Sequence, residues 1–440
     1  MKIIGQLLDR HKPKLKNTFW LVGEDLFRRS LSFILLIFMT RYLGVISFGK
    51  LSYALNFLPM LPPLASLGTD KLTLQALVHY PKKNQAIVGT ALFIRAVMGM
   101  LLIPVIFLIA YQLQPQDSLM RLLIIIATSG VAFEAGNVLA FWFQAKERLD
   151  RVALARSVAF SIAISWRLVL ILKKASLITF AWSYLGERLL VFLCLLFFFR
   201  MSGGKPLAWR FDLNFARDLV RKGFPIMLTQ AVILLYLRLD IVFLQYFKGA
   251  ASVGIYALAA KLCEPLSFLG LALIMAFSPA LISTYKKMKE KYWQKLAKLS
   301  AALSSIAYLL VVLVLLFGKP LIIFIFGQEY SLAGAVLGVL ILNIFFVFIG
   351  DLRETTLILE KQQAFYFFSM LAALFASVLL NLNLIPRYGV YGVVWTKLTV
   401  ALTFDLIITL LYPPTRKLAW TQIRSLLIYP LFTEKEANKK

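Results

Sequence analysis

The sequence predicts an all-α, polytopic membrane protein, and three observations point to this fold class. Of its 440 residues, 60% are hydrophobic and only 16% are charged, and the mean hydropathy is +0.79. A soluble protein of this length cannot bury so many apolar side chains, because much of its surface must stay polar. The apolar residues also recur in blocks of about 20, the length of a helix that crosses a hydrocarbon layer about 30 Å thick. A membrane barrel would instead show alternating segments of about ten residues.

Twelve apolar blocks are expected to cross the membrane as helices. The second contains Pro59, Pro62 and Pro63 and is expected to bend, because proline removes a backbone donor. The expected spans cover residues 18–40, 51–68, 85–111, 119–142, 152–172, 176–199, 224–247, 252–283, 299–317, 331–351, 363–384 and 390–411.

The long connector at residues 200–222 divides these spans six and six. Ser47-Phe-Gly49, followed by Tyr53-Ala-Leu55, opens the second span, and Ser252-Val-Gly254, followed by Tyr256-Ala-Leu258, opens the eighth. The echo suggests a duplicated unit, and hence two six-helix lobes related by a pseudo-two-fold axis. We therefore predict an N-lobe (1–199), the connector (200–222), a C-lobe (223–412) and a tail (413–440).

The connector itself carries aromatic and basic residues that suggest a short helix lying in the membrane interface. Trp209, Phe211, Phe215 and Leu219 would share one face, with Arg210, Arg217 and Arg221 directed towards lipid phosphates. The alternative is a solvated linker.

Net charge is +27, from 48 Lys and Arg against 21 Asp and Glu. The basic residues concentrate at the N-terminus, in connectors after even-numbered spans and in the tail, so the positive-inside rule predicts that both termini are cytoplasmic. This pattern explains the charge without a nucleic-acid partner. Cys194 and Cys263 lie within apolar runs, and His11 and His79 are isolated, so no metal site or cofactor is expected.

Charged residues inside the spans are the candidate functional residues. A Lys or Arg at the centre of a membrane helix costs about 2.5–3.5 kcal/mol, so it is expected to face a protein interior or a watery cavity. The stretch 223–265 is the richest in such residues, with Arg238 and Asp240 in one span and Lys261 and Glu264 in the next. Further cations within spans are Arg28, Arg29, Arg95, Arg167, Arg188 and Lys397.

Ion pairing is the structural alternative for these charges. Glu24 precedes Arg28 by four residues and Asp25 precedes Arg29 by four, a spacing that lets each pair form on one helix. The acids Glu134, Asp240, Glu264 and Asp405 could couple transport to an ion or a proton, or neutralise a nearby cation; we favour pairing. Asp351, Arg353 and Glu354 are expected to form a solvated or interfacial cluster at the end of the span 331–351.

Several motifs along nearly the whole chain resemble one membrane family. They are Phe48-Gly-Lys-Leu-Ser-Tyr53, Leu67-Gly-Thr-Asp70, Phe143-Gln-Ala-Lys-Glu147, Gly223-Phe-Pro225, Arg238-Leu-Asp240, Val253-Gly-Ile-Tyr-Ala257, Phe326-Gly-Gln-Glu-Tyr330 and Leu384-Ile-Pro-Arg-Tyr-Gly389. In order and spacing the chain resembles polysaccharide (O-antigen type) flippases of the multidrug/oligosaccharidyl-lipid/polysaccharide exporter superfamily. Val393-Val-Trp-Thr-Lys397 departs from the small residues common at that place in the family.

The resemblance implies two lobes around a central cavity, in the bacterial inner membrane. It also implies transport of undecaprenyl-pyrophosphate-linked oligosaccharide from the cytoplasmic to the periplasmic leaflet, with polysaccharide polymerase and chain-length proteins as partners besides membrane lipids. An anionic diphosphate needs cations to replace its lost hydration. We therefore expect Arg28, Arg29, Arg95, Arg238 and Lys261 to contact cargo, with Arg28 and Arg29 meeting Arg238 across the pseudo-two-fold axis.

Two other functions remain to be weighed against this one. A multidrug or cation antiporter of the same fold would need acidic cavity residues more than basic ones, and the embedded charges here are mainly cations. A membrane polymerase or glycosyltransferase would need a large loop with catalytic groups, whereas the longest connector is 200–222. No nucleophile–base arrangement is evident, so an enzyme is not expected.

Overall fold

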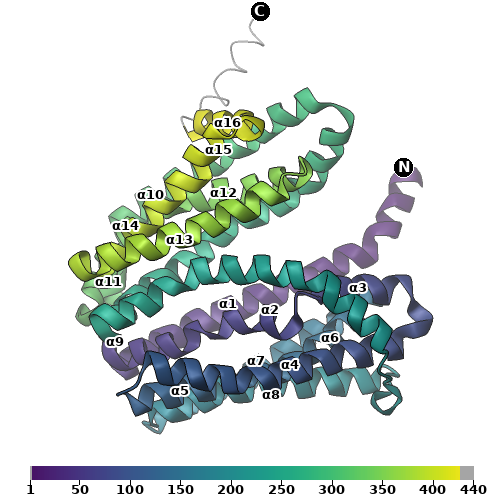
Figure 1. The fold of residues 1–440 in the computed structure, drawn as a ribbon, viewed down its shortest axis with the longest axis horizontal. Helices are drawn as coiled ribbons and strands as arrows, with labels where there is room; N and C mark the ends of the chain where they lie inside the picture. Colours follow the sequence, from purple (N-terminus) through teal and green to yellow (C-terminus); the bar gives the residue numbers. More distant parts are fainter. Residues whose placement is uncertain (1, 427–440) are drawn as a thin grey trace, which may run out of the picture. The chain divides into compact units, whose positions relative to one another are not determined.

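The computed structural model describes residues 2–426, and it describes side chains from residue 20 onward apart from those of 21, 22, 207 and 286. Within 2–426 the chain forms helices and turns and no β-strand, which confirms the all-α fold. It divides into two compact units, Met1–Leu234 and Leu235–Lys440. We call them unit 1 and unit 2 and describe each separately (Figure 1).

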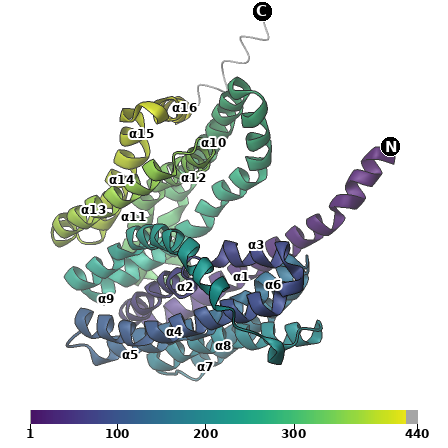
Figure 2. The same cartoon turned by 45° about the vertical axis from the view of Figure 1, so that its right-hand side comes forward.

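Unit 1 is a bundle in which α4, α5, α7 and α8 run beside one another (Figures 1 and 2). Helix α7 packs between α1 and α8, while α8 also packs on α5 and on the 3-10 segment η3. Its elements are α1 (Lys2–Asn56), η1 (Leu58–Met60), α2 (Leu61–Ser66), α3 (Asp70–His79), η2 (Pro81–Lys83), α4 (Asn84–Leu113), α5 (Ser118–Ser129), η3 (Gly130–Gly136), α6 (Asn137–Ala145), α7 (Leu149–Leu172), α8 (Leu177–Met201), η4 (Pro206–Ala208) and the first part of α9 (Leu213–Lys287).

Unit 2 is built around α10, which packs on α11, α12 and α16, while α13 packs on α14. A buried cluster that includes Tyr292, Leu303 and Phe348 joins α10 and α12, and the second part of α9 adds Ile274 and Leu281. The elements after α9 are α10 (Lys289–Phe326), η5 (Gln328–Tyr330), α11 (Ser331–Leu340), η6 (Ile341–Asn343), α12 (Ile344–Leu359), α13 (Gln363–Tyr388), α14 (Val390–Ala401), η7 (Leu402–Ile407), α15 (Ile408–Leu411), η8 (Pro413–Thr415) and α16 (Arg416–Leu426).

Ten helical segments of residues 2–426 are long and apolar enough to cross a membrane. Two of the ten are long enough to contain two spans each. The segment Gly23–Ser66 contains Gly44 with φ 67° and ψ 174°, and the segment Leu213–Tyr285 contains Gly249 with φ 76° and ψ −177°. That backbone region is accessible essentially to glycine alone, so each glycine breaks one long helix into two spans. Residues 2–426 therefore form twelve membrane helices, six in each half, as the sequence predicts.

Three of the described spans contain a 3-10 segment within their length. The second is divided into η1 and the short helix α2 beside Pro59, Pro62 and Pro63, which confirms the predicted bend. The fourth contains the 3-10 segment η3, and the tenth, its counterpart in the second half, contains η6. Short 3-10 stretches inside helices mark hinges or strained positions. Matching interruptions in both halves add to the evidence for a duplicated unit.

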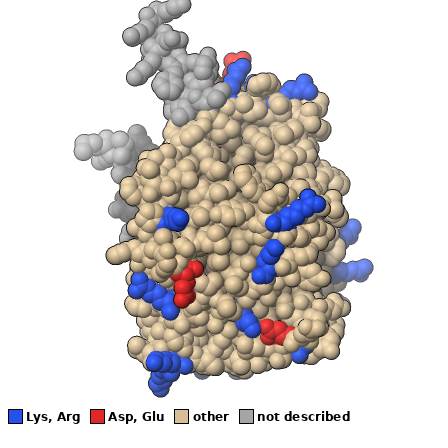
Figure 3. Space-filling model, turned by 90° about the vertical axis from the view of Figure 1, so that its left-hand side faces the viewer, with Lys and Arg blue, Asp and Glu red and all other residues tan. Residues whose placement is uncertain are grey.

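The surface is that of a protein surrounded by lipid. Large apolar side chains are widely exposed, with 81% of Leu172 and 80% of Phe324 accessible. Figure 3 shows one face on which charged side chains are few and scattered among uncharged ones. A soluble protein could not present so much apolar surface to water without associating. Such a surface, with the twelve spans, makes this a multi-pass membrane protein.

The connector differs from the predicted short interfacial helix. Helix α9 begins only at Leu213 and continues into the seventh span, so Trp209 and Phe211 precede it. Trp209 and Phe215 pack against the buried cluster of α4, α6, α7 and α8, and Leu219 packs against Ile94. Arg210, Arg217 and Arg221 are exposed, as predicted. The helical pattern there is real, but it belongs to the start of α9.

The predicted tail is partly structured. Helix α16 packs on α10 and α12 and buries Leu418 and Gln422, whose Nε2 donates to the carbonyl of Ile349 at 3.0 Å. It therefore belongs to unit 2. The remaining residues of the tail, 427–440, lie outside the described residues.

Candidate functional site

Unit 2 contains a cavity of about 350 Å³ whose wall carries four charged side chains. Arg238 and Asp240 come from α9 before Gly249, Glu264 comes from α9 beyond it, and Lys397 comes from α14. The cavity therefore lies where the stretch 223–265 folds back on itself. Charges from three membrane helices converge there, in a layer where an unpaired charge is costly.

Asp240 is the most deeply placed of these groups, with 3% of its side chain accessible. Its carboxylate accepts from Tyr256 Oη at 2.7 Å and from Lys397 Nζ at 2.8 Å, and its other oxygen accepts from the backbone N–H of Ile241 at 2.8 Å. Lys397 also lies 5.8 Å from the centre of the Tyr256 ring. These contacts fully compensate the carboxylate and fix Lys397 in the cavity wall.

Arg238 lies in the same cavity wall, opposite Glu264. Its Nη2 lies 4.0 Å from Glu264 Oε1, at the limit of an ion pair, and 58% of the Glu264 side chain is accessible. A pair of this length with an exposed carboxylate contributes little stability. Arg238 therefore presents its planar donor group in the cavity wall, and its contact with Glu264 in particular is weak. Lys261 is exposed on α9 and does not line this cavity.

The 3-10 segment η6 forms part of the same wall. Ile341 and Asn343 line the cavity, and Asn343 Oδ1 is buried without a hydrogen-bond partner among the described residues. A buried amide oxygen without a partner costs about 1–3 kcal/mol, so it needs a donor. Sequence reasoning missed Asn343, because a single Asn in an apolar span resembles ordinary packing.

A second charged pair in unit 2 corrects one expectation. Arg353 is fully buried: its Nη1 donates to Asp405 Oδ1 at 2.8 Å and its Nη2 donates to Ser369 Oγ at 2.9 Å. The predicted solvated cluster around Arg353 was wrong, because α12 continues to Leu359 and carries this residue inward. Asp405 lies in η7, a π-helical turn, and such turns often occur at functional positions.

In unit 1, three arginines gather around two acids. Arg188 Nη1 donates to Glu134 Oε1 at 2.7 Å, and Arg28 Nη1 lies 3.3 Å from Glu24 Oε1. Arg156 on α7 interacts electrostatically with both acids and with both other arginines, and it has no ion-pair partner among the described residues. This cluster draws on α1, α7, α8 and η3.

The other predicted cations of unit 1 have local partners. Arg29 Nε donates to Asp25 Oδ2 at 2.6 Å on the surface of α1. Arg95, with 3% of its side chain accessible, pairs with Asp70 and lies 5.2 Å from the Phe141 ring. Arg167 is likewise buried and pairs with Glu187 at 2.6 Å. Arg95 and Arg167 thus tie neighbouring helices together.

The structure brings all four predicted acids beside cations: Glu134 with Arg188, Asp240 with Lys397, Glu264 with Arg238 and Asp405 with Arg353. The sequence analysis placed Arg188 among the cations within spans, but it gave no cargo or coupling role to Arg156, Arg188 or Arg353. Their position within apolar spans was the signal available for the first two. Their partners come from other helices, and no spacing along the chain reveals such contacts.

Comparisons with known proteins agree with this architecture. The sequence profile of a family described as polysaccharide biosynthesis protein matches residues 14–284, well over half of the chain. Among curated proteins, no significant sequence match is found.

Solved structures show the same fold. The chain is similar to the lipid II flippase MurJ in an inward closed conformation, with a TM-score of 0.74 at 13% identity over 95% of this chain and 93% of that one. It is also similar to an inward-facing multidrug resistance MATE family transporter of the MOP superfamily, with a TM-score of 0.67 at 13% identity over 92% and 98% of the two chains. The MATE multidrug transporter DinF-BH gives 0.57 at 13% identity over 94% and 96%. The family match and the shared fold confirm the resemblance seen in the motifs: the chain belongs to the polysaccharide biosynthesis protein family, within the fold of MOP superfamily transporters.

Proposed function

We propose that this protein is a flippase for undecaprenyl-pyrophosphate-linked oligosaccharide. It would move this lipid from the cytoplasmic to the periplasmic leaflet of the bacterial inner membrane by alternating access, for cell-surface polysaccharide biosynthesis. The cavity of unit 2 carries the proposal, because it places Arg238 and Lys397 in the wall of a space within the membrane-spanning region. Membership of a polysaccharide biosynthesis family and the transporter fold support it.

The chemistry of the cargo fits Arg238 better than Lys397. A pyrophosphate that leaves water needs donors to replace its hydration, and a guanidinium offers a planar pair of donors. The 4.0 Å contact of Arg238 with the exposed Glu264 is weak, so an anion in the cavity would compete with it at small cost. Lys397 is tied to the buried Asp240 at 2.8 Å, so removing it would leave a buried carboxylate without compensation. We assign cargo contact to Arg238 and a positioning role to Lys397, Asp240 and Tyr256.

In unit 1, Arg28 and Arg156 are the best placed cations for an anionic cargo. Arg28 has a 3.3 Å contact with Glu24 and lies 5.0 Å from the Phe160 ring, while Arg156 has no ion-pair partner among the described residues. Lys261, which is exposed, and Arg29 are proposed to attract cargo phosphates. Arg95 is proposed to hold α4 against α3.

The antiporter of the same fold is the second candidate. Such a protein needs a carboxylate that is available to a cation or a proton within the membrane. In the described residues, each of Glu134, Asp240, Glu264 and Asp405 already faces an Arg or Lys. We therefore propose charge pairing rather than ion coupling for these four acids. An enzyme is the third alternative, and the family and its structural neighbours, which are transporters, argue against it.

The function is tested by the leaflet distribution of lipid-linked oligosaccharide in cells with and without the protein. Loss of the protein is expected to accumulate the lipid on the cytoplasmic side and to deplete surface polysaccharide. Wild type and the control variant Arg221→Ala, on the exposed start of α9, should restore both, whereas Arg238→Ala should not. An unchanged lipid distribution with altered drug tolerance would instead identify an antiporter.

A further inference from the structure

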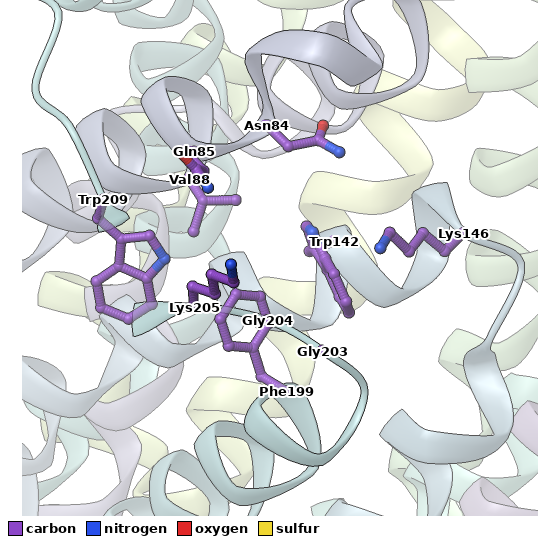
Figure 4. Close-up of a pocket in the computed structure, with 10 residues that line it drawn as sticks. All are labelled: Asn84, Gln85, Val88, Trp142, Lys146, Phe199, Gly203, Gly204, Lys205 and Trp209. Atoms are coloured by element: carbon purple, nitrogen blue, oxygen red, sulfur yellow. The ribbon is translucent and has the colours of Figure 1, made fainter. Parts of the chain in front are cut away.

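One end of unit 1 contains a cavity of about 220 Å³ that the proposed transport route does not use (Figure 4). It lies between the start of α4, the end of α6, the turn after α8 and the connector residue Trp209. All these parts belong to ends of spans, where lipid headgroups and aromatic side chains meet.

The wall of the cavity is aromatic and well anchored. The Trp142 and Phe199 rings meet edge-on with centroids 4.7 Å apart. The centroids of the Phe199 and Trp209 rings are 5.9 Å apart. The connector that carries Trp209 is fastened to α4, since the Asp212 N–H donates to Thr90 Oγ1 at 2.9 Å. The cavity is therefore a preformed feature of unit 1.

Two exposed lysines and one buried donor border this cavity. Among the described residues, neither Lys146 nor Lys205 has an ion-pair partner, and the indole Nε1 of Trp209 is buried without an acceptor. Figure 4 shows the ammonium of Lys205 and the indole nitrogen of Trp209 pointing into the space between the rings. A buried indole N–H can only donate, so Trp209 Nε1 requires an acceptor, and an anion placed there would also lie beside the two exposed ammonium groups.

A fourth group narrows the chemistry of the ligand. Asn84 Oδ1 is also buried without a hydrogen-bond partner among the described residues, and it accepts rather than donates. It calls for a hydroxyl group beside the anion. Lys146 lies 3.7 Å from the centre of the Trp142 ring, and partial burial lowers the pKa of its ammonium. A bound anion would offset this cost of desolvation.

We propose that this cavity binds the headgroup of an anionic phospholipid that carries a hydroxyl group, such as phosphatidylglycerol. The phosphodiester accepts from Lys146, Lys205 and Trp209 Nε1, and a headgroup hydroxyl donates to Asn84 Oδ1. Bound in this way, the lipid would link α4, α6, α8 and the connector at the membrane surface. The same phosphate chemistry is available from inorganic phosphate, so the test separates the two sources.

The test measures the melting temperature of the delipidated, full-length protein in detergent with short-chain phosphatidylglycerol, short-chain phosphatidylcholine or inorganic phosphate. Phosphatidylglycerol is expected to raise the melting temperature, whereas phosphatidylcholine and inorganic phosphate should not. The double variant Lys146→Gln/Lys205→Gln should lose the response. The control Lys173→Gln/Lys174→Gln, which changes two exposed lysines at the other end of α7, should keep it.

Trp209→Phe provides a second variant that keeps an aromatic ring but removes the N–H. It should weaken the affinity for phosphatidylglycerol by about tenfold, as expected for one lost hydrogen bond to a charged group. The melting temperatures without lipid show whether each variant folds. An equal response to inorganic phosphate would overturn the assignment to lipid. An undiminished response in the Lys146→Gln/Lys205→Gln variant would overturn the site.

Discussion

Buried charges in this protein are compensated by partners on other helices, and Asp240 with Lys397 is the clearest case. The Lys397 ammonium and the Tyr256 phenol both contact one carboxylate oxygen of Asp240. The backbone N–H of Ile241 contacts the other. Removing one member of such a pair leaves an uncompensated charge, whereas removing both is far less costly. Each residue therefore depends on its partner, and single substitutions exaggerate what the pair contributes.

This dependence predicts the result of a double-mutant cycle. Asp240→Asn and Lys397→Met should each lower the free energy of unfolding by about 3–5 kcal/mol, and the double variant should recover most of the loss. Unfolding in detergent measures the free energy of unfolding of wild type, the two single variants and the double variant. Additive losses in the double variant would show that the two side chains do not compensate each other.

Asp117 allows a pH prediction outside the membrane-spanning segments. Partial burial alone would raise its pKa, but the hydrogen bond from Lys50 Nζ at 2.9 Å and the N-cap bond from the Met120 N–H hold the pKa below the usual value. A carboxyl with a lowered pKa in the folded state stabilises the fold above its unfolded pKa, about 3.9, and loses this effect as the pH falls further.

Asp117→Asn should therefore reduce the melting temperature at pH 7, and the difference from wild type should shrink as the pH falls below about 4. Melting temperatures across this pH range measure the effect. A difference that stays constant to low pH would mean that the Asp117 charge contributes nothing to stability.

At the scale of elements, two glycines set the architecture. Gly44 and Gly249 each lie three residues before the echoed motifs that begin with Ser47 and Ser252, and each turns one long helix into two spans. Their backbone conformation is the same in both halves. No L-residue adopts it without strain.

Gly44→Ala should lower the free energy of unfolding by about 1–3 kcal/mol. The matched control is Gly23→Ala, at an open position in the same helix, which should be neutral or slightly stabilising because alanine favours helix. Denaturation in detergent compares the two variants. A Gly44→Ala protein as stable as Gly23→Ala would show that the kink does not require glycine.

The sequence predicts the helices well because each apolar block must satisfy its backbone within the membrane. It also predicts the bend at Pro59 and the paired lobes. It fails at Arg353, because hydropathy falls after Gly350 while the helix continues to Leu359, and it cannot identify Asp405 as the partner. Likewise, Arg238 is evident as a charge within a span, but its cavity and its loose contact with Glu264 depend on how distant helices pack.

At the scale of the whole molecule, the charge distribution predicts orientation in the membrane. After Cys194 and Cys263 are replaced by alanine, Lys174→Cys should react with an impermeant maleimide added to cells whose inner membrane is intact. Lys205→Cys, in a connector on the predicted cytoplasmic side, should react only after lysis. The reverse pattern of labelling would place the termini outside.

The central claim is that this protein moves a pyrophosphate-linked lipid and that Arg238 contacts its headgroup. The most direct measurement is translocation of undecaprenyl-pyrophosphate-linked oligosaccharide in proteoliposomes, followed by its exposure to an externally added glycosidase. Wild type and Arg221→Ala should expose the inner pool, and Arg238→Ala should slow this by about tenfold or more, because it loses charge-assisted hydrogen bonds. Translocation by Arg238→Ala at the wild-type rate would contradict the assigned site, and no acceleration by wild type would contradict the function.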